Sequence, residues 1–321
     1  MNAPGAPAAP GPAGRGAAIR AGSQSFALAS RLFDPATRDL VWDLYAWCRH
    51  CDDVVDGQTF GHDAGPVADR AGRLDRLRAG TEAAFDGTAD PADPFGALGR
   101  VVAATGLPRR LADDHLAGFA MDAAGRRYAA VDDTLDYCYH VAGVVGLMMA
   151  WVMGVRDPSV LLRASDLGLA FQLSNIARDV GDDLRHGRVY VPATWLEEAG
   201  VALTPGLPLD RAHAARVAPA AARLVAEAER YYDSAWHGVP YLPFRSAWAV
   251  ATARLVYRDI GRAVVHRGAD AWATRTVVST PRKLARLVEA GLSAGWGTAR
   301  GGRPGPPRDG LFTPPAVAVL G

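Results

Sequence analysis

The chain has 321 residues, 49% of them hydrophobic, so it can bury a large core. Its 35 basic and 34 acidic residues give a formal net charge of +1, and this balance excludes the basic face or stripe typical of nucleic-acid binding. An odd, small set of three cysteines does not form a disulfide framework and fits a reducing cytoplasm.

Helical spacing of apolar residues dominates the chain, and no period-2 strand pattern competes with it. Residues 1–16 are rich in Ala, Pro and Gly, lack the apolar stretch of a secretory signal, and are predicted to be a disordered tail. Helices are predicted over 37–56, 66–86, 108–122, 132–153, 159–183, 209–237, 243–267 and 281–292, with a short one near Trp195. The predicted fold is all-α, a single domain of packed helices over 17–294, followed by a Gly/Pro-rich flexible tail over 295–321.

The longest apolar run, Val141–Val155, contains only apolar residues and Gly. It falls short of the roughly 20 residues that a membrane-spanning helix needs. A buried helix is therefore predicted here, and any membrane contact must be peripheral.

The first informative motif is the pair Asp52 and Asp56, which lie four residues apart and so on one face of the predicted helix 37–56. Aromatic neighbours such as Tyr45 and Trp47 indicate that this helix is largely buried. Buried carboxylates are costly without a partner. A hard divalent cation such as Mg²⁺, which takes oxygen ligands, would relieve their repulsion.

The second motif lies on the predicted helix 159–183. Asn175, Asp179 and Asp183 follow one another at intervals of four residues and form a polar stripe, with Gln172 beside it. If the two stripes face each other across a cavity, they form a site for more than one Mg²⁺. Each motif alone is equally typical of a solvated helix face with surface ion pairs, but both lie in strongly apolar helices.

Arginines accompany both motifs. Arg49 precedes Asp52 by three positions, Arg178 adjoins Asp179, and Arg188 follows in a loop. The planar guanidinium matches phosphate oxygens, and Mg²⁺ commonly bridges carboxylates to substrate phosphates. The combination favours metal-assisted departure of a diphosphate.

Arg49 also has a structural interpretation, an ion pair with Asp53 within the helix.

Other candidate metal groups are weak. Cys48 and Cys51 have the spacing of a redox or metal pair, but no second pair follows. His140 lies on an apolar helix, where a hydrogen-bonded core histidine is the better interpretation. The small residues around Ala142 and Gly146 on that helix allow either tight helix packing or a groove for a hydrocarbon chain.

Several stretches in register resemble the squalene/phytoene synthase family, and bacterial phytoene synthases within it. The resemblance covers roughly residues 20–290. Its segments are Ser25–Phe26, Tyr45–Gly57, Tyr137–Gly146, Gln172–Asp179, Gly187–Pro192, Ala247–Thr252 and Ser279–Leu284.

The resemblance implies packed helices around one large central cavity, with an acidic motif on each of two opposite walls. It implies that Mg²⁺, with Mn²⁺ as an alternative, is held by Asp52, Asp56, Asn175, Asp179 and Asp183, and that Tyr137 lies near the reacting carbons. The diphosphate-binding residues that it implies are Ser23, Ser25, Tyr45, Arg49, Gln172, Arg178, Arg188, Tyr257 and Arg275.

Three residues depart from the family pattern. Ser174 stands where Thr is usual, and Val189 where Cys is common. Gly181 falls inside the second acidic motif, where it costs roughly 1 kcal/mol of helix stability against Ala. We expect the helix end to loosen there.

The resemblance implies head-to-head condensation of two geranylgeranyl diphosphates through a cyclopropyl diphosphate to phytoene, the first committed step of carotenoid biosynthesis. One alternative is a C30 synthase that makes squalene or dehydrosqualene from farnesyl diphosphate. Another is a non-catalytic helical assembly factor of the same fold, which should have lost its metal ligands. No dinucleotide fingerprint is present, so no NADPH requirement is expected.

The expected product has no polar group, so it must pass into lipid. We expect a cytoplasmic protein that works peripherally at the inner face of the membrane, with downstream carotenoid enzymes as candidate partners. The candidate membrane contact is the loop 184–208, with Val189, Val191, Trp195 and Leu196, and an ordinary packed loop is the alternative interpretation.

Overall fold

The computed structural model describes residues 24–56, 70–302 and 305–315, which form helices and loops without a strand. The side chains of residues 24–26, 56, 70 and 71 lie outside the description, as does the predicted tail 1–16. The all-α prediction is confirmed. The helices are α2 (Gln24–Ser30), α3 (Pro35–Asp56), α4 (Arg70–Phe85), α5 (Pro94–Thr105), α6 (Arg109–Ala123), α7 (Val131–Cys138), η1 (Tyr139–Gly143), α8 (Val144–Val152), α9 (Pro158–Arg185), α10 (Ala193–Glu198), α11 (Arg211–Trp236), η2 (Val239–Tyr241), α12 (Phe244–Arg267), η3 (Gly268–Trp272) and α13 (Thr280–Ala299).

The sequence prediction missed α5, because its start resembles a loop. Asp93 caps the helix by accepting a hydrogen bond from the Gly96 amide at 2.7 Å, and Pro94 occupies the first helical position. Pro is favoured at that position because the amide it lacks would have no partner within the helix. The same Pro/Asp/Gly composition that favours a break therefore begins a helix here.

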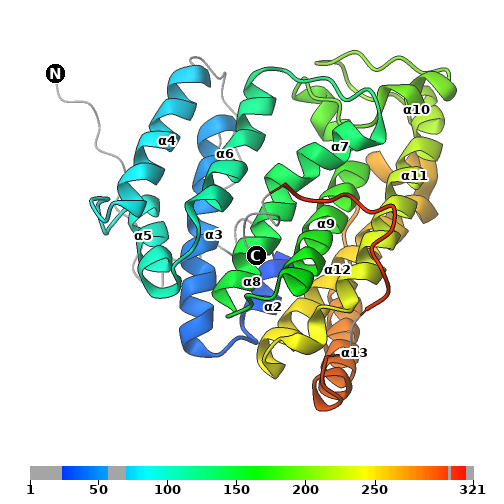
Figure 1. The fold of residues 1–321 in the computed structure, drawn as a ribbon. Helices are drawn as coiled ribbons and strands as arrows, with labels where there is room; N and C mark the ends of the chain where they lie inside the picture. Colours follow the sequence, from blue (N-terminus) through cyan, green and yellow to red (C-terminus); the bar gives the residue numbers. More distant parts are fainter. Residues whose placement is uncertain (1–23, 57–69, 303–304, 316–321) are drawn as a thin grey trace.

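Helix α9 is the centre of the fold and packs against α8, α11 and α12 (Figure 1). Its small residues allow backbone contact with the preceding helices. A Cβ at Gly168 would lie 2.2 Å from the carbonyl oxygen of Ala142, and one at Gly146 would lie 2.3 Å from that of Ala164. The tight-packing interpretation is therefore correct, and the contact leaves a groove as well, because these residues also line the cavity described below.

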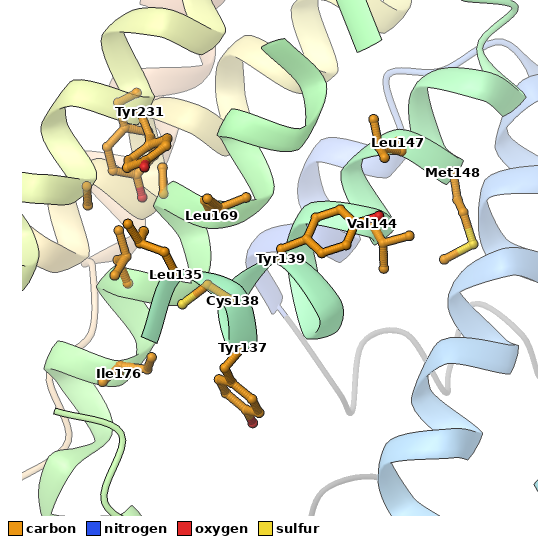
Figure 2. Packing of buried hydrophobic residues seen from close by; sticks show 14 of the residues in the cluster. Leu135, Tyr137, Cys138, Tyr139, Val144, Leu147, Met148, Leu169, Ile176 and Tyr231 are labelled. Atoms are coloured by element: carbon orange, nitrogen blue, oxygen red, sulfur yellow. The ribbon is translucent and has the colours of Figure 1, made fainter. Parts of the chain in front are cut away.

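The helical run Val131–Val152 is interrupted by a π-helical turn at η1, between α7 and α8. By length and composition alone the run could cross a membrane, but 56% of its apolar window is buried within the described protein. Tyr139, Val144, Leu147 and Met148 pack in this core (Figure 2). The predicted buried helix is thus observed, with a π-turn that the sequence did not indicate.

The predicted domain boundary at 294 is wrong, because α13 continues to Ala299. Residues 305–315, called here the C-terminal strap, then cross α9 and α11. The Arg308 guanidinium donates to both carboxylate oxygens of Asp166, which is fully buried, and the Phe312 amide donates to the hydroxyl of Tyr231. A Gly/Pro-rich segment is ordered here because its few polar and aromatic residues have buried partners.

Candidate active site

One cavity of about 1030 Å³ lies among α3, α6, α7, α8, α9 and α12. It is at the top of the range of roughly 300–1,000 Å³ typical of ligand pockets. Helix α8 packs against both α3 and α9, and thereby connects the two helices that carry the acidic motifs. The predicted site residues that line the cavity are Tyr45, Arg49, Asp52, Tyr137, Gln172, Asn175, Arg178, Asp179, Asp183, Arg188, Tyr257 and Arg275.

Three predicted site residues are not placed. Ser23 and the side chains of Ser25 and Asp56 lie outside the described residues. Of the two acids predicted on α3, only Asp52 has a described side chain. It is 42% exposed and lines the cavity, so the predicted facing of the two acidic motifs depends on it.

Arg49 links the carboxylates of α3. Its guanidinium donates to Asp53 Oδ1 at 2.7 and 3.0 Å and lies 2.9 Å from the carboxylate of Asp52. Burial alone would lower the pKa of Arg49, but Asp52 and Asp53 raise it above its ordinary value. The intrahelical pair with Asp53 thus exists, and the same side chain also lines the cavity.

On α9 the acids are deeper. Burial, followed by repulsion from Asp179, raises the pKa of Asp183 well above its ordinary value. Arg178 donates to both oxygens of Asp179, and Arg275 approaches that carboxylate at 3.9 Å. The helix continues through Gly181 to Arg185, so the expected loosening there is not observed.

The residues present fit a divalent metal ion. Asn175 Oδ1 is buried and has no hydrogen-bond partner among the described residues, and its amide nitrogen is 3.5 Å from Gln172 Oε1. Asp183 is a buried carboxylate whose charged form is penalised. Mg²⁺ binds hard oxygen ligands of this kind, and it would supply the interaction that these oxygens lack in the protein. Asn175, Asp179, Asp183 and Asp52 would hold the metal.

Asp122, at the end of α6, is a cavity residue that the sequence analysis missed. Its carboxylate accepts hydrogen bonds from Tyr137 at 3.0 Å and Tyr190 at 2.8 Å, and these two rings stack with centroids 4.5 Å apart. Burial raises the pKa of both tyrosines well above the ordinary value. The phenols therefore stay neutral, and their hydroxyls are fixed. Tyr137 is seen in Figure 2 pointing away from the aliphatic core.

A spacing signal for Asp122 does exist. His115, Phe119 and Asp122 follow at i, i+4 and i+7 on α6, and all three line the cavity. Much of the remaining cavity wall is apolar. It includes Phe33, Val141, Met149, Phe171, Leu242 and Val250.

A model of the family described as squalene/phytoene synthase matches residues 19–283. The chain belongs to the squalene/phytoene synthase family. It is 55% identical over 272 residues to a phytoene synthase of Pseudescherichia vulneris, covering 84% of this chain and 87% of the relative. It is 47% identical to the 15-cis-phytoene synthase of a Paracoccus species, covering 93% of this chain and 96% of the relative.

The fold also matches a crystal structure of a dehydrosqualene synthase in complex with ligand. The TM-score is 0.74 at 27% identity, and the match covers 87% of this chain and 94% of the other. The squalene/phytoene synthase family uses prenyl diphosphates and in general needs a divalent metal ion. The resemblance read from the sequence is therefore confirmed at the level of the family and of the fold.

Proposed function

We propose that this chain condenses two molecules of geranylgeranyl diphosphate head to head to phytoene, the first committed step of carotenoid biosynthesis. One structural observation carries the proposal. Carboxylates from α3 and α9 line a single large cavity whose other walls are mainly apolar. Relatives named phytoene synthase and 15-cis-phytoene synthase, at 55% and 47% identity, support it as well.

Different cavity residues bind the diphosphates and surround the hydrocarbon tails. Arg49, Arg178 and Arg188 present guanidinium donors suited to phosphate oxygens. Bound Mg²⁺, or Mn²⁺ in its place, would supply Lewis-acid neutralisation of the leaving diphosphate. The first departure leaves an allylic cation, which the 2,3 double bond of the second substrate attacks. Loss of a proton then closes the three-membered ring and gives the cyclopropyl diphosphate. Loss of its diphosphate, rearrangement and proton loss give the hydrocarbon.

The apolar wall keeps water away from the cationic carbons, because water would quench them. Tyr137 and Tyr190, whose phenols stack, line the same cavity as the acids and this wall. Their neutral rings offer a polarisable face to positive charge, and their hydroxyls are already bound to Asp122.

A C30 product from farnesyl diphosphate is the second candidate, because the dehydrosqualene synthase structure has the same fold. The higher identity to phytoene synthases favours C40. Incubation of the purified protein with C15 and C20 diphosphates, and identification of the hydrocarbon formed, decides between them. We expect phytoene from the C20 substrate without NADPH, and a C30 hydrocarbon as the main product would overturn the C40 assignment.

The metal is tested by removal. We expect turnover to cease in excess EDTA and to return with Mg²⁺, because Asn175 Oδ1 is buried without a hydrogen-bond partner among the described residues and burial penalises the charged form of Asp183. Asp52→Ala and Asp183→Asn should abolish product with an unfolding temperature unchanged or raised. Asp75→Asn, at an exposed acid on α4, is the matched control and should leave turnover intact. Full turnover in EDTA would contradict the metal requirement.

We also propose that the protein is cytoplasmic and acts at the inner membrane face, where it passes its product to downstream carotenoid enzymes. The support is chemical, since a C40 hydrocarbon without a polar group cannot accumulate in water.

A further inference from the structure

Helix α13 carries an exposed apolar stripe, defined here as Leu284, Val288, Leu292 and Trp296. Their exposed fractions are 51, 62, 74 and 65%. The four residues follow at intervals of four, so they share one side of the helix. Contiguous exposed apolar patches of this kind mark interaction sites on soluble proteins.

The opposite side of α13 is firmly attached, so the stripe is not the product of a loose helix. Ala290 and Ala294 are buried. Asp259 of α12 accepts hydrogen bonds from both Arg282 and Arg286, and Trp248 donates to the Leu287 carbonyl at 2.8 Å. The stripe is therefore presented to the surroundings on a fixed support (α13 in Figure 1).

The stripe begins beside the cavity. Val277, Val278 and Lys283 line the cavity immediately before and within the first turn of α13. The side chain of Val277 is also 71% exposed, so it lies where the cavity meets the outside. The first residue of the stripe, Leu284, thus directly follows the cavity residue Lys283 in the sequence.

Charge and aromatic residues indicate the kind of partner. Arg282 and Arg286 are bound to Asp259, so the other cations of α13 and of the residue that follows it are Lys283 and Arg300, and the one acid, Glu289, pairs with Arg286. The guanidinium of Arg300 lies 3.9 Å from the centre of the Trp296 ring. Excess cations beside exposed Trp and Leu match an anionic lipid surface, where Trp prefers the interface.

The chain's own N-terminus is a poor match for the stripe. Residues 1–23 contain only Met1 and Ile19 as large apolar residues, against four on the stripe. The C-terminal strap leaves α13 and reaches Tyr139 on η1, whose ring lies 6.0 Å from that of Phe312.

The loop 184–208, expected from the sequence to contact the membrane, is largely covered instead. Val191 and Leu196 are buried, and the guanidinium of Arg223 lies 4.2 Å from the centre of the Trp195 ring. Only Leu207 is a large exposed apolar residue there, at 55%. The packing of these apolar side chains agrees with the packed-loop interpretation of this segment.

We propose that the α13 stripe docks the protein on an anionic bilayer surface and so brings the cavity mouth against the lipid. Substrate tails and the hydrocarbon product would then pass between bilayer and cavity without crossing water. The identity of the substrate tails and of the hydrocarbon product rests on the proposed function. The test of docking measures binding, so it does not rely on turnover.

The test is co-sedimentation with vesicles of phosphatidylcholine and phosphatidylglycerol, and with vesicles of phosphatidylcholine alone. We expect the wild type to bind, more strongly to the anionic vesicles. Leu292→Ser/Trp296→Ser should lower the partition coefficient by about tenfold or more, because burial of each side chain in the interface is lost. Leu207→Ser is the matched control and should bind as the wild type does. Leu284→Ser/Val288→Ser is the second variant if the first fails to fold.

Turnover of detergent-dispersed C20 diphosphate, measured on the same samples, separates the two proposals. We expect both stripe variants to keep it. No hydrocarbon from any sample would overturn the proposed function while the binding data still decide the role of the stripe. The docking proposal is overturned if the wild type does not sediment with vesicles, if both stripe variants bind equally well, or if Leu207→Ser weakens binding as much. Light scattering that shows a dimer, reduced to a monomer by the stripe variants without vesicle binding, would assign the stripe to a second copy.

Discussion

The Arg49 side chain fits both interpretations drawn from the sequence, the ion pair within its helix and the diphosphate contact at the cavity. It binds Asp53 within α3 and reaches Asp52 at the cavity. We expect Arg49→Lys to lower kcat/KM by about 10- to 150-fold, because losing a charged hydrogen bond costs about 1.5–3 kcal/mol and lysine lacks the planar fork.

Asp53→Asn is the control for Arg49, because Asp53 is outside the cavity lining. If Arg49 served only the intrahelical pair, this variant would impair turnover as much as Arg49→Lys does. We expect it to keep most of the activity, as measured by steady-state kinetics.

His115 gives the protein a specific acid sensitivity. Burial lowers its pKa from 6.5 to about 4. Its Nδ1 lies 3.2 Å from the His140 carbonyl, and its Nε2 is buried without a partner among the described residues. Because the unfolded chain binds this proton and the folded one resists it, stability is full above pH 6.5 and is lost as pH falls towards about 4.

We expect His115→Gln to reduce this fall in the free energy of unfolding between pH 6.5 and 4, measured by urea titration at each pH. His213→Gln, at an exposed histidine on α11, should follow the wild-type curve. Identical curves for His115→Gln and the wild type would assign the acid sensitivity to other groups.

The sequence identified the side chains that lie in recurring motifs, but not those defined only by the fold. Asp179 and Asp183 are four residues apart on one helix, so their shared face follows from helical geometry. Asp122 shares a face of α6 with His115 and Phe119, but its bonds to Tyr137 and Tyr190 bring together two other segments of the chain. Such a meeting depends on tertiary packing, which a single sequence does not encode locally.

At the scale of elements, the contact of α9 with η1 and α8 depends on glycine. We expect Gly168→Ala to destabilise the protein by about 1–3 kcal/mol, because the new Cβ would lie 2.2 Å from the Ala142 carbonyl oxygen and would force the helices apart. Thermal unfolding measures the loss.

Gly181→Ala is the matched control on the same helix. A Cβ there would meet Trp272 at 3.4 Å, an ordinary contact. We expect a gain of about 1 kcal/mol from helix propensity. Equal effects of the two alanines would contradict the close-packing account of α9.

Most helix positions could be predicted because the periodic apolar pattern is strong in long amphipathic segments. The π-turn at η1 could not, since its residues continue an apolar helix and only the packing of α6 and α9 around it distinguishes the turn. The start of α5 could not be predicted because its local residues, Asp93 and Pro94, favour a break in a helix and equally favour the beginning of one.

At the scale of the whole molecule, the C-terminal strap connects the end of the chain to its centre. We expect Arg308→Leu to destabilise the protein by about 3–5 kcal/mol, because it leaves the buried carboxylate of Asp166 with Ser234 but without the guanidinium that pairs with it directly. Arg211→Leu, which removes an exposed pair with Asp270, should cost less than about 1 kcal/mol. Equal losses in chemical denaturation would contradict a structural role for the strap.

The strap also bears on the order in which the protein is made. Asp166 lies 142 residues before Arg308, and its carboxylate is fully buried in the finished fold. The central helix is therefore synthesised well before Arg308, whose guanidinium pairs with its buried carboxylate. We expect premature termination just after α13 to yield a protein in which the buried carboxylate of Asp166 lacks its ion-pair partner.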